Sequence, residues 1–260
     1  MRRTAFLFLF SLITMGMAAA APGAAAFEIR VISGGAAKAF VQPLAESFKS
    51  QSGHAVLLDF QPMGTLLKSL AGGQSVDMVI VTGEVLEQLE GEGRFPKGIG
   101  RPLARVGVGV AVNERAPDPD ISSAEAFRRT LLAARSVVYI DPTIGTSGKH
   151  VAQMLERLGI AEQMKSKTTL LKGGYVVEPV GRGEIELGIH QISEMLPVKG
   201  IRVVGPLPAE LQKYTTYVAV PTGGSGADSG KSAATEAFIR HLTGQAARSR
   251  LAAAGYSTPE

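Results

Sequence analysis

The 260-residue chain contains no cysteine, and its few histidines are scattered. Without cysteine the protein has no disulfide bond, no thiolate nucleophile and no cysteine-ligated metal site. The histidines His54, His150, His190 and His241 include no H-x-x-x-H pair, so we expect no zinc site, and nothing else in the sequence calls for a cofactor. Stability has to come from packing, which about 234 residues beyond a leader can supply in one or two domains.

The sequence also lacks a strong excess of charge of either sign. The formal net charge of +4 falls to +2 once Arg2 and Arg3 are removed with a leader, which leaves 25 basic against 23 acidic side chains. There is no basic cluster with interleaved aromatic residues. The composition therefore gives no support for nucleic-acid binding.

The first 26 residues have the pattern of a secretory signal peptide. Arg2 and Arg3 precede an apolar run at residues 5–17, and small residues follow up to Ala26. The run is too short to span a bilayer comfortably, and no later segment is long and apolar enough to do so. No cysteine follows for lipid attachment. We expect cleavage after Ala26, with Ala20 as the second choice, and an exported, soluble monomer without a membrane anchor, which for a bacterial chain indicates the periplasm.

Beyond the leader, strand and helix patterns alternate almost without a break. Strands are predicted at residues 28–32, 55–60, 78–81, 105–112, 136–140, 187–189, 201–204 and 217–220. Such alternation predicts an α/β fold with mostly parallel sheets and helices on both faces. Because one sheet with so many strands is less favourable than two lobes, we assign residues 27–105 and 214–260 to a first lobe. Residues 106–213 form the second, joined to the first by two crossing strands.

The most distinctive segment runs from Asp141 to His150, between a buried strand and a helical pattern. Thr146 and Ser147 could cap the helix, Gly148 allows close approach, and Lys149 adds a positive charge. A helix N-terminus that follows a small-residue loop presents backbone N–H groups to an anion. The alternative is an ordinary helix cap with no ligand.

The same arrangement recurs nearer the N-terminus. Ser33 and Gly34 follow the first strand, and Gly64 and Thr65 begin the helix after the second. Hydroxyl and backbone N–H donors from these turns could meet those of Thr146 and Ser147 around one anion, which avoids burying an unpaired lysine. Here too, Ser33 and Thr65 could be simple helix caps.

These turns and their order carry a resemblance that covers nearly the whole chain after the leader. The opening strand with Ser33-Gly34-Gly35, the helix start Met63-Gly64-Thr65 and the strand Asp77-Met78-Val79-Ile80 resemble type II periplasmic substrate-binding proteins. Residues 137–158 resemble the second-lobe anion loop of their molybdate-binding branch. The resemblance implies two α/β lobes, a small anionic ligand in the cleft, and delivery to the membrane permease of an ABC importer. Backbone groups of Tyr175 or Val176 could complete the second-lobe site, although Gly173-Gly174 is more often just a loop.

One position departs from that branch. Gln191 stands where the molybdate binders carry a tyrosine that donates to the oxyanion, so we predict weak molybdate binding and better binding of a carboxylate. Residues 186–200 and 205–212 instead resemble a second group of binding-protein-like chains, which includes a periplasmic aconitate isomerase.

An isomerase is therefore the alternative to a binding protein. Interconverting cis- and trans-aconitate needs one base near neutral pH and donors for three carboxylates, and no cofactor. His190 is the candidate base, because only histidine titrates naturally in that range, and Glu178 or Glu194 is next to test. The alternative is that His190 is a structural residue on its strand. Lys149, His150 and Arg182 are candidates for carboxylate contacts, although Arg182 fits a solvated surface position better. A regulatory binding module would share the same cleft.

Overall fold

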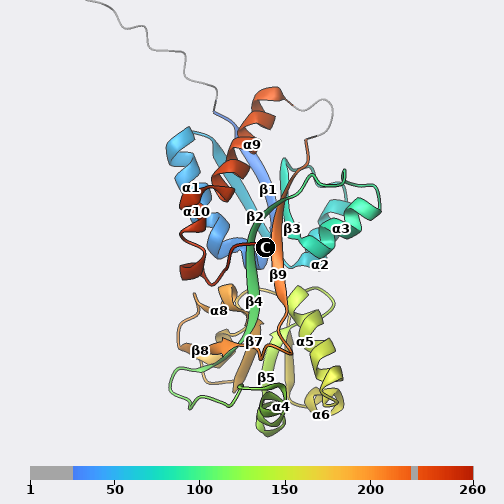
Figure 1. Ribbon diagram of the computed structural model, residues 1–260, viewed down its shortest axis with the longest axis vertical. Coiled ribbons are helices and arrows are strands. Elements are labelled where there is room, and N and C mark those ends of the chain that lie inside the picture. The colour runs from blue at the N-terminus through green and yellow to red at the C-terminus, as the bar shows by residue number, and fades with distance from the viewer. Residues whose placement is uncertain (1–25, 224–227, 260) are drawn as a thin grey trace, which may run out of the picture.

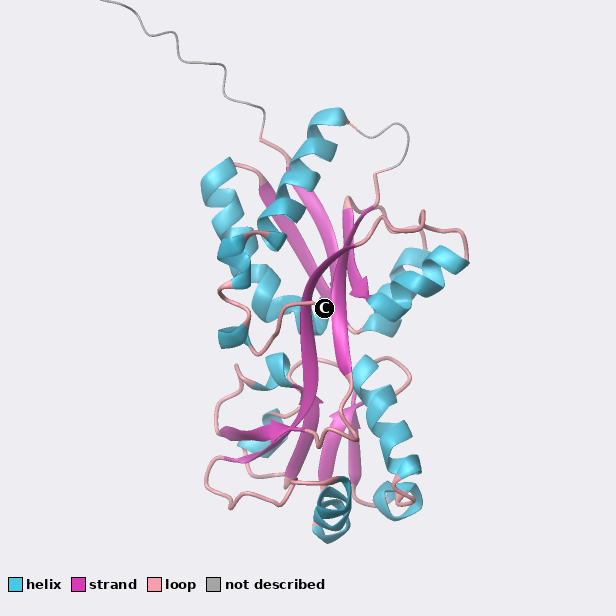
Figure 2. Ribbon diagram, in the orientation of Figure 1, coloured by secondary structure: helices cyan, strands magenta, loops and turns pink. Residues whose placement is uncertain are grey.

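The computed structural model describes residues 26–223 and 228–259, so the predicted leader lies outside the described part except for its last residue, Ala26. The chain forms two α/β lobes stacked along the long axis of the molecule (Figure 1). The two crossing strands are β4 (Arg101–Asn113), which runs from the first lobe into the second, and β9 (Tyr214–Pro221), which enters the first lobe beside the first half of β4. Strands occupy the middle of each lobe and helices flank them on both sides (Figure 2).

The first lobe combines the N-terminal elements with the C-terminal helices. Its elements are β1 (Glu28–Gly34), η1 (Gly35–Ala37), α1 (Lys38–Ser52), β2 (Ala55–Gln61), α2 (Met63–Ala71), β3 (Met78–Thr82), α3 (Gly83–Gly91), α9 (Ser229–Thr243), α10 (Gln245–Arg248) and η2 (Ala252–Ala254). The chain end returns to the middle of the molecule, where the Arg105–Ser257 bridge attaches it to β4 (Figure 1).

The second lobe is built from the central part of the chain. Its elements are α4 (Ala124–Ala133), β5 (Val137–Ile140), α5 (Thr146–Arg157), α6 (Ala161–Lys165), β6 (Thr168–Leu171), α7 (Glu178–Gly181), β7 (Leu187–Gln191), α8 (Ile192–Met195) and β8 (Ile201–Pro206). The short elements β6, α6 and α8 have no counterpart among the elements predicted from the sequence. Four or five residues are too few for a periodic pattern to stand out.

Strand direction differs between the core of each lobe and the crossing strands. The strands follow the order β2-β1-β3-β9-β4-β7-β5-β6, with β8 paired to β4. Pairs among β1, β2 and β3 and among β5, β6 and β7 are parallel, as predicted. All pairs of β4 and β9 are antiparallel, because each crossing strand returns the chain to the other lobe.

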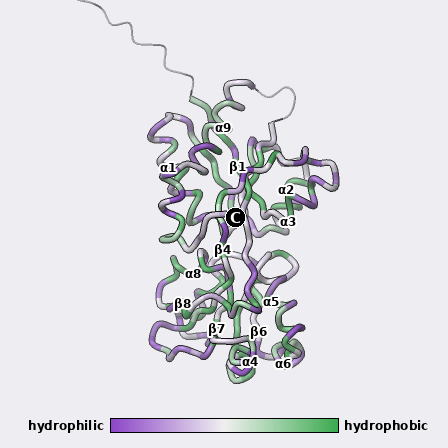
Figure 3. Tube along the Cα trace, in the orientation of Figure 1, coloured by the Kyte–Doolittle hydropathy of each residue, from purple (hydrophilic) through white to green (hydrophobic). Residues whose placement is uncertain are grey.

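Separate hydrophobic clusters underlie the two lobes. Along β4, Val106 belongs to the first cluster, whereas Val108 and Val110 belong to the second. Ala111 faces a third cluster on the other side of the second-lobe sheet, since successive strand residues point to opposite faces. Hydrophilic residues collect on the outer turns and loops (Figure 3). The change of cluster lies next to the boundary that we propose at residues 105 and 106.

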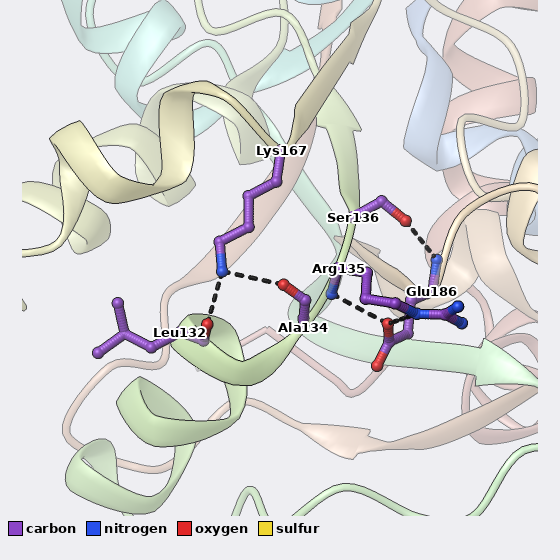
Figure 4. Close-up of polar contacts among 6 residues, drawn as sticks. All are labelled: Leu132, Ala134, Arg135, Ser136, Lys167 and Glu186. Carbon is purple, nitrogen blue, oxygen red and sulfur yellow. Dashed lines mark hydrogen bonds and ion pairs between the residues drawn. The ribbon is translucent and has the colours of Figure 1, made fainter.

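Polar contacts fix the end of the second-lobe sheet that is remote from the first lobe (Figure 4). Lys167 Nζ donates to the carbonyls of Leu132 and Ala134, at 2.6 and 2.9 Å. It thus supplies a hydrogen-bond donor to carbonyl groups at the C-terminal end of α4. Glu186 Oε2 accepts from the backbone N–H of Arg135 at 3.0 Å, and Glu186 N–H donates to Ser136 Oγ at 3.0 Å. These bonds align the starts of β5 and β7, whose other ends face the first lobe.

Candidate functional site

A cavity of about 170 Å³ lies between the two lobes. Holding a single water takes only about 10–15 Å³ on the same measure, so there is room for a small organic molecule. The residues that line it are Gly34, Gly35, Ala36, Lys38, Ala39, Phe60, Gln61, Pro62, Met63, Ile140, Gly145, Thr146, Ser147, Gly173, Gly174, Tyr175, His190, Gln191, Ser193, Glu194 and Tyr217. Most of them follow the carboxyl ends of parallel strands, where α/β sheets bind their ligands.

The loop between β5 and α5 is held by Asp141. Its side chain accepts from the backbone N–H and the hydroxyl of Thr143, at 2.8 and 2.7 Å, and these bonds lower the pKa of the carboxyl. Its carbonyl accepts from the N–H groups of Ile144 and Gly145. The turn places Gly145 at the N-cap of α5 without a side-chain cap. Thr146 and Ser147 are therefore the first helical residues rather than its caps.

Gly148 allows α5 to begin directly over the end of β5. A Cβ at this position would lie 2.0 Å from the carbonyl oxygen of Ile140, a distance that no side chain tolerates. On the same helix, Val151, Met154 and Leu155 are buried in the second-lobe cluster. Burying each such side chain contributes about 1.5–3 kcal/mol. This packing fixes the first turn of α5 at the cavity.

His190 lies at the cavity between a hydroxyl and a carboxylate. Its Nδ1 is 2.9 Å from Ser147 Oγ, and its Nε2 is 2.9 Å from Glu194 Oε2. The imidazole side chain is 1% exposed and that of Glu194 18% exposed. The Nε2 contact is at ion-pair distance but lacks the angle of a hydrogen bond, so its attraction depends on protonation of the ring. Ser147, His190 and Glu194 form a continuous polar chain, which we call the cleft triad.

Gln191, the next residue on β7, points an amide towards the same cavity. Tyr217 of β9 donates its hydroxyl to Gln191 Oε1 at 3.2 Å, which leaves the amide nitrogen facing elsewhere. Within the described residues, this Nε2 and that of His190 are the buried side-chain nitrogens without a hydrogen-bond partner. Burial, and then the nearby Glu194, raise the pKa of Tyr217 well above its usual value, so the hydroxyl stays a donor. An acceptor in the cavity would satisfy the Gln191 amide.

The first-lobe wall consists mostly of backbone and apolar side chains. Gly34 has to be glycine, because a Cβ there would lie 2.7 Å from both Met63 Cε and Tyr217 Cε1. Lys38, an exposed residue at the start of α1, is the one lysine or arginine among the residues that line the cavity. Its Nζ lies 6.0 Å from the ring centre of Phe60 and 5.7 Å from that of Tyr175, which belong to opposite lobes.

Helix starts at the cavity differ from the capped starts elsewhere. The helices α3, α4 and α9 have side-chain caps from Thr82, Ser123 and Asp228, and none of these residues lines the cavity. The starts of η1, α2, α5 and α8 line the cavity and have no side-chain cap. The short helices α6, α7 and α10 also lack a side-chain cap, but they lie away from the cavity. The long helix α5 thus offers N–H groups and a positive dipole end to an anion.

The structure places only some of the predicted ligand-binding residues at the cavity. Gly34, Thr146, Ser147, Tyr175, His190 and Gln191 line it. The residues Ser33, Gly64, Thr65, Gly148, Lys149 and Val176 do not. The side chain of Ser33 is completely buried and donates to the carbonyl of Gly34, whereas Thr65 and Lys149 are exposed. Val176 is buried in the second-lobe core.

Gly64 has a different neighbour from the one predicted. Its N–H donates to the carbonyl of Ile144 at 2.9 Å, which joins the first lobe to the second. Nearby, a Cβ on Gly173 would lie 3.3 Å from the ring of Pro62. The two lobes therefore touch along one rim of the cavity.

The side chains considered for carboxylate contacts also lie elsewhere. His150 is buried, its Nε2 is 2.7 Å from the carbonyl of Leu211, and burial lowers its pKa. Arg182 is exposed and pairs with Glu184 at 2.7 Å and with Glu178 at 3.9 Å. Neither residue lines the cavity.

Sequence reasoning missed Lys38 and Tyr217, and treated Glu194 only as a second choice of base. Lys38 lies four residues after Gly34, where α1 begins. Its position just after a strand and a Gly-Gly turn could have predicted that it lies near the cavity. Glu194 lies four residues after His190 across a strand-to-helix turn, a spacing that no regular period marks. Tyr217 comes from a crossing strand, which only the tertiary fold brings to β7.

Two further features bear on the class of site. Among the residues that the structure describes, no three histidine or acidic side chains gather in a way that could hold a metal ion. In the same residues, no helix has the length and apolar character needed to cross a membrane.

Known proteins share this architecture. An aconitate isomerase from Pseudomonas sp. is 31% identical over 195 residues, which are 73% of this chain and 73% of that protein. The molybdate-binding protein ModA of Azotobacter vinelandii is 24% identical over 193 residues, 70% of this chain and 72% of that protein. The solved periplasmic molybdate-binding protein of Azotobacter vinelandii matches with a TM-score of 0.72 at 19% identity, over 89% of this chain and 100% of that chain. This likeness confirms the predicted two-lobed periplasmic-binding-protein fold.

The family match spans both lobes. The family model described as bacterial extracellular solute-binding protein matches residues 29–257. That range includes both crossing strands and every residue that lines the cavity. The chain therefore belongs to the family of bacterial extracellular solute-binding proteins.

Proposed function

We propose that the protein captures a small carboxylate anion in the cavity between its lobes. The observation that carries the proposal is the mixture of groups on the cavity wall. Ser147, the Gln191 amide, the start of α5 and Lys38 supply donors and positive charge, while Phe60, Met63 and Ile140 supply apolar surface. A carbon skeleton with carboxylates uses both kinds of group, whereas an inorganic oxyanion has no apolar surface to bury.

The location and partner belong to the same proposal. The predicted leader and the family indicate the periplasm, where such a protein delivers its ligand to the membrane permease of an ABC importer. The likeness to ModA leaves molybdate as the natural competitor. Because Gln191 occupies the position where a tyrosine donor is expected, we predict that molybdate binds weakly.

A thermal-shift screen of residues 27–260 tests this proposal. The panel comprises molybdate, tungstate, sulfate, phosphate, citrate, cis-aconitate and trans-aconitate. At one hundred times its dissociation constant, a ligand stabilises the folded protein by about 2.7 kcal/mol. We expect the largest stabilisation from a carboxylate. Tight molybdate binding that survives Gln191→Ala would contradict the proposal.

Aconitate isomerisation is the second candidate function, and the cleft triad is the observation that favours it. The base takes a proton from the allylic CH₂ of aconitate, the double bond shifts by one carbon, and a proton is added to the former vinylic CH, which becomes the new CH₂. His190 lines the cavity, which supports it as the group that exchanges that proton. Its ring nitrogens already contact Ser147 and Glu194, so the ring releases one partner or transfers the proton through it. The 31% identical relative is an aconitate isomerase.

Incubation with either isomer separates the two candidates. An isomerase interconverts cis- and trans-aconitate without added cofactor, and a binding protein leaves both unchanged. If the wild-type protein is active, His190→Asn should lower the rate at saturating substrate by about 10²–10⁴. An active wild type whose His190→Asn variant keeps the full rate would move the base to Glu194. A wild type that is inert toward both isomers would remove the isomerase.

A further inference from the structure

The cavity that we propose for an anion already contains a carboxylate. Glu194 lines it, and the one lysine or arginine in the lining is the exposed Lys38 at its mouth. A ligand carboxylate would bring a second negative charge close to the first. Like charges that share a poorly solvated site are costly unless one of them is neutralised. The group placed to neutralise Glu194 is His190, whose Nε2 is 2.9 Å from it.

The state of His190 also decides what the Ser147 hydroxyl can do. A neutral imidazole has one N–H and one lone pair. If the hydrogen were on Nδ1, the unprotonated Nε2 would lie 2.9 Å from a carboxylate oxygen of Glu194, and the two electron-rich atoms would repel. The hydrogen therefore belongs on Nε2, and Nδ1 accepts from Ser147. The hydroxyl has a single hydrogen, so in this state it has none to give to a ligand.

Protonation reverses that bond. A protonated ring carries a hydrogen on both nitrogens, so Nδ1–H donates to Ser147 Oγ, and the positive charge of the ring lies next to the Glu194 carboxylate. The hydroxyl hydrogen is then free to turn towards the cavity, which Ser147 lines. The same proton thus neutralises the carboxylate and supplies a donor for the anion.

We propose that anion capture takes up one proton on His190, which turns the Ser147 hydroxyl from the imidazole to the bound anion. This inference rests on the proposed capture of a small anion in the same cavity. It makes affinity depend on pH, because a ligand that binds with a proton binds more weakly as pH rises. For one proton the dissociation constant rises by up to about tenfold per pH unit.

Other titratable groups around the triad do not offer this proton. Tyr217 on β9 and Tyr256 near the chain end both lie close to Glu194. Burial is the largest cause that raises the pKa of each hydroxyl, and Glu194 is the next cause that raises it. Both stay protonated through the neutral range. Tyr175 and Lys38 line the outer part of the cavity, next to each other and at an ion–ring distance of 5.7 Å.

Calorimetric titration with trans-aconitate tests the coupling. Titrations in two buffers of different ionisation enthalpy, repeated between about pH 6.5 and 8, give the number of protons taken up. We expect a number that approaches one at the alkaline end of the range. His190→Asn should bring it near zero and flatten the dependence of affinity on pH. Glu194→Gln should flatten it too, because a neutral amide no longer favours the protonated ring. All variants share the ligand's own ionisation, so their differences report on the protein.

The chain offers a matched control in a second serine–histidine pair. His241 Nε2 lies 2.7 Å from Ser47 Oγ on the outside of the first lobe. His241→Asn should leave proton uptake unchanged. Tight binding of trans-aconitate without proton uptake by the wild type would overturn the coupling and leave the capture proposal standing. Absence of trans-aconitate binding across the pH range would overturn both.

Discussion

The two walls of the cavity present different chemical groups to the space between the lobes. The first-lobe wall uses Gly34, Gly35 and Ala36, which expose backbone, together with apolar side chains and Lys38. The second-lobe wall uses the cleft triad and Gln191, whose side chains hold one another in place. A backbone wall keeps its N–H groups when a side chain changes, except where a Cβ does not fit, as at Gly34. A side-chain wall concentrates specificity, and sensitivity, in a few positions.

The largest effect is expected from Gly148→Ala, which disturbs the frame of the second-lobe wall. The added Cβ would clash with the carbonyl of Ile140, so α5 has to shift away from β5. We expect the free energy of unfolding to fall by about 1–3 kcal/mol and anion binding to be lost. Denaturant titration and calorimetry measure the two. Gly91→Ala at the end of α3 is the control, since a Cβ there meets no atom within 4 Å. A stable Gly148→Ala that binds normally would show that the start of α5 does not shape the site.

Ser147→Ala removes one donor from that wall and leaves its frame intact. A hydrogen bond to a charged group contributes about 1.5–3 kcal/mol, so the dissociation constant should rise roughly 10- to 100-fold. Ser47→Ala, which affects the other serine–histidine pair, should leave affinity unchanged. Equal affinities of the wild type and Ser147→Ala would mean that the hydroxyl does not reach the ligand.

On the first-lobe wall, Lys38→Gln should have a smaller effect. The residue is exposed, and exposed ion pairs contribute at most about 1 kcal/mol, so affinity should fall by about two- to fivefold. The loss should shrink as salt is added, because salt screens exposed charges. Lys68→Gln on α2, outside the cavity, is the matched control. A loss as large as that of Ser147→Ala would place the main charge contact on the first lobe.

Thr65→Ala should have the smallest effect. Its side chain is exposed and does not line the cavity, so affinity should stay within about twofold of the wild type. A tenfold loss, measured by the same calorimetry, would mean that α2 turns towards the ligand in the bound protein.

The strand-to-helix turns could be predicted from sequence, because they leave local signals. The β-branched run ending at Ile140, the small-residue loop and the helical spacing after Thr146 are all visible in the linear chain. The direction of β9 left no such signal, since hydrophobic alternation is the same in parallel and antiparallel strands. Its pairing decides that Tyr217 meets Gln191.

The exact side chains of the site were harder to predict than its position. Residues one step apart on a strand point to opposite faces, so Ser33 is buried beneath the wall that Gly34 forms. A shift of one residue is within the error of any boundary read from a pattern. The meeting of His190 with Ser147 joins residues 43 positions apart, which only the parallel pairing of β5 and β7 brings about.

The contact of Gly64 with Ile144 has a kinetic consequence. If the ligand is released on this side of the cavity, the lobes first have to separate there, because this bond and the contact of Pro62 with Gly173 join the rim. The residence time of the ligand is then set by the opening of the rim as well as by contacts on the ligand itself. One backbone hydrogen bond has a net value of about 0.5–1.5 kcal/mol, enough to lengthen that time roughly two- to tenfold without touching the ligand.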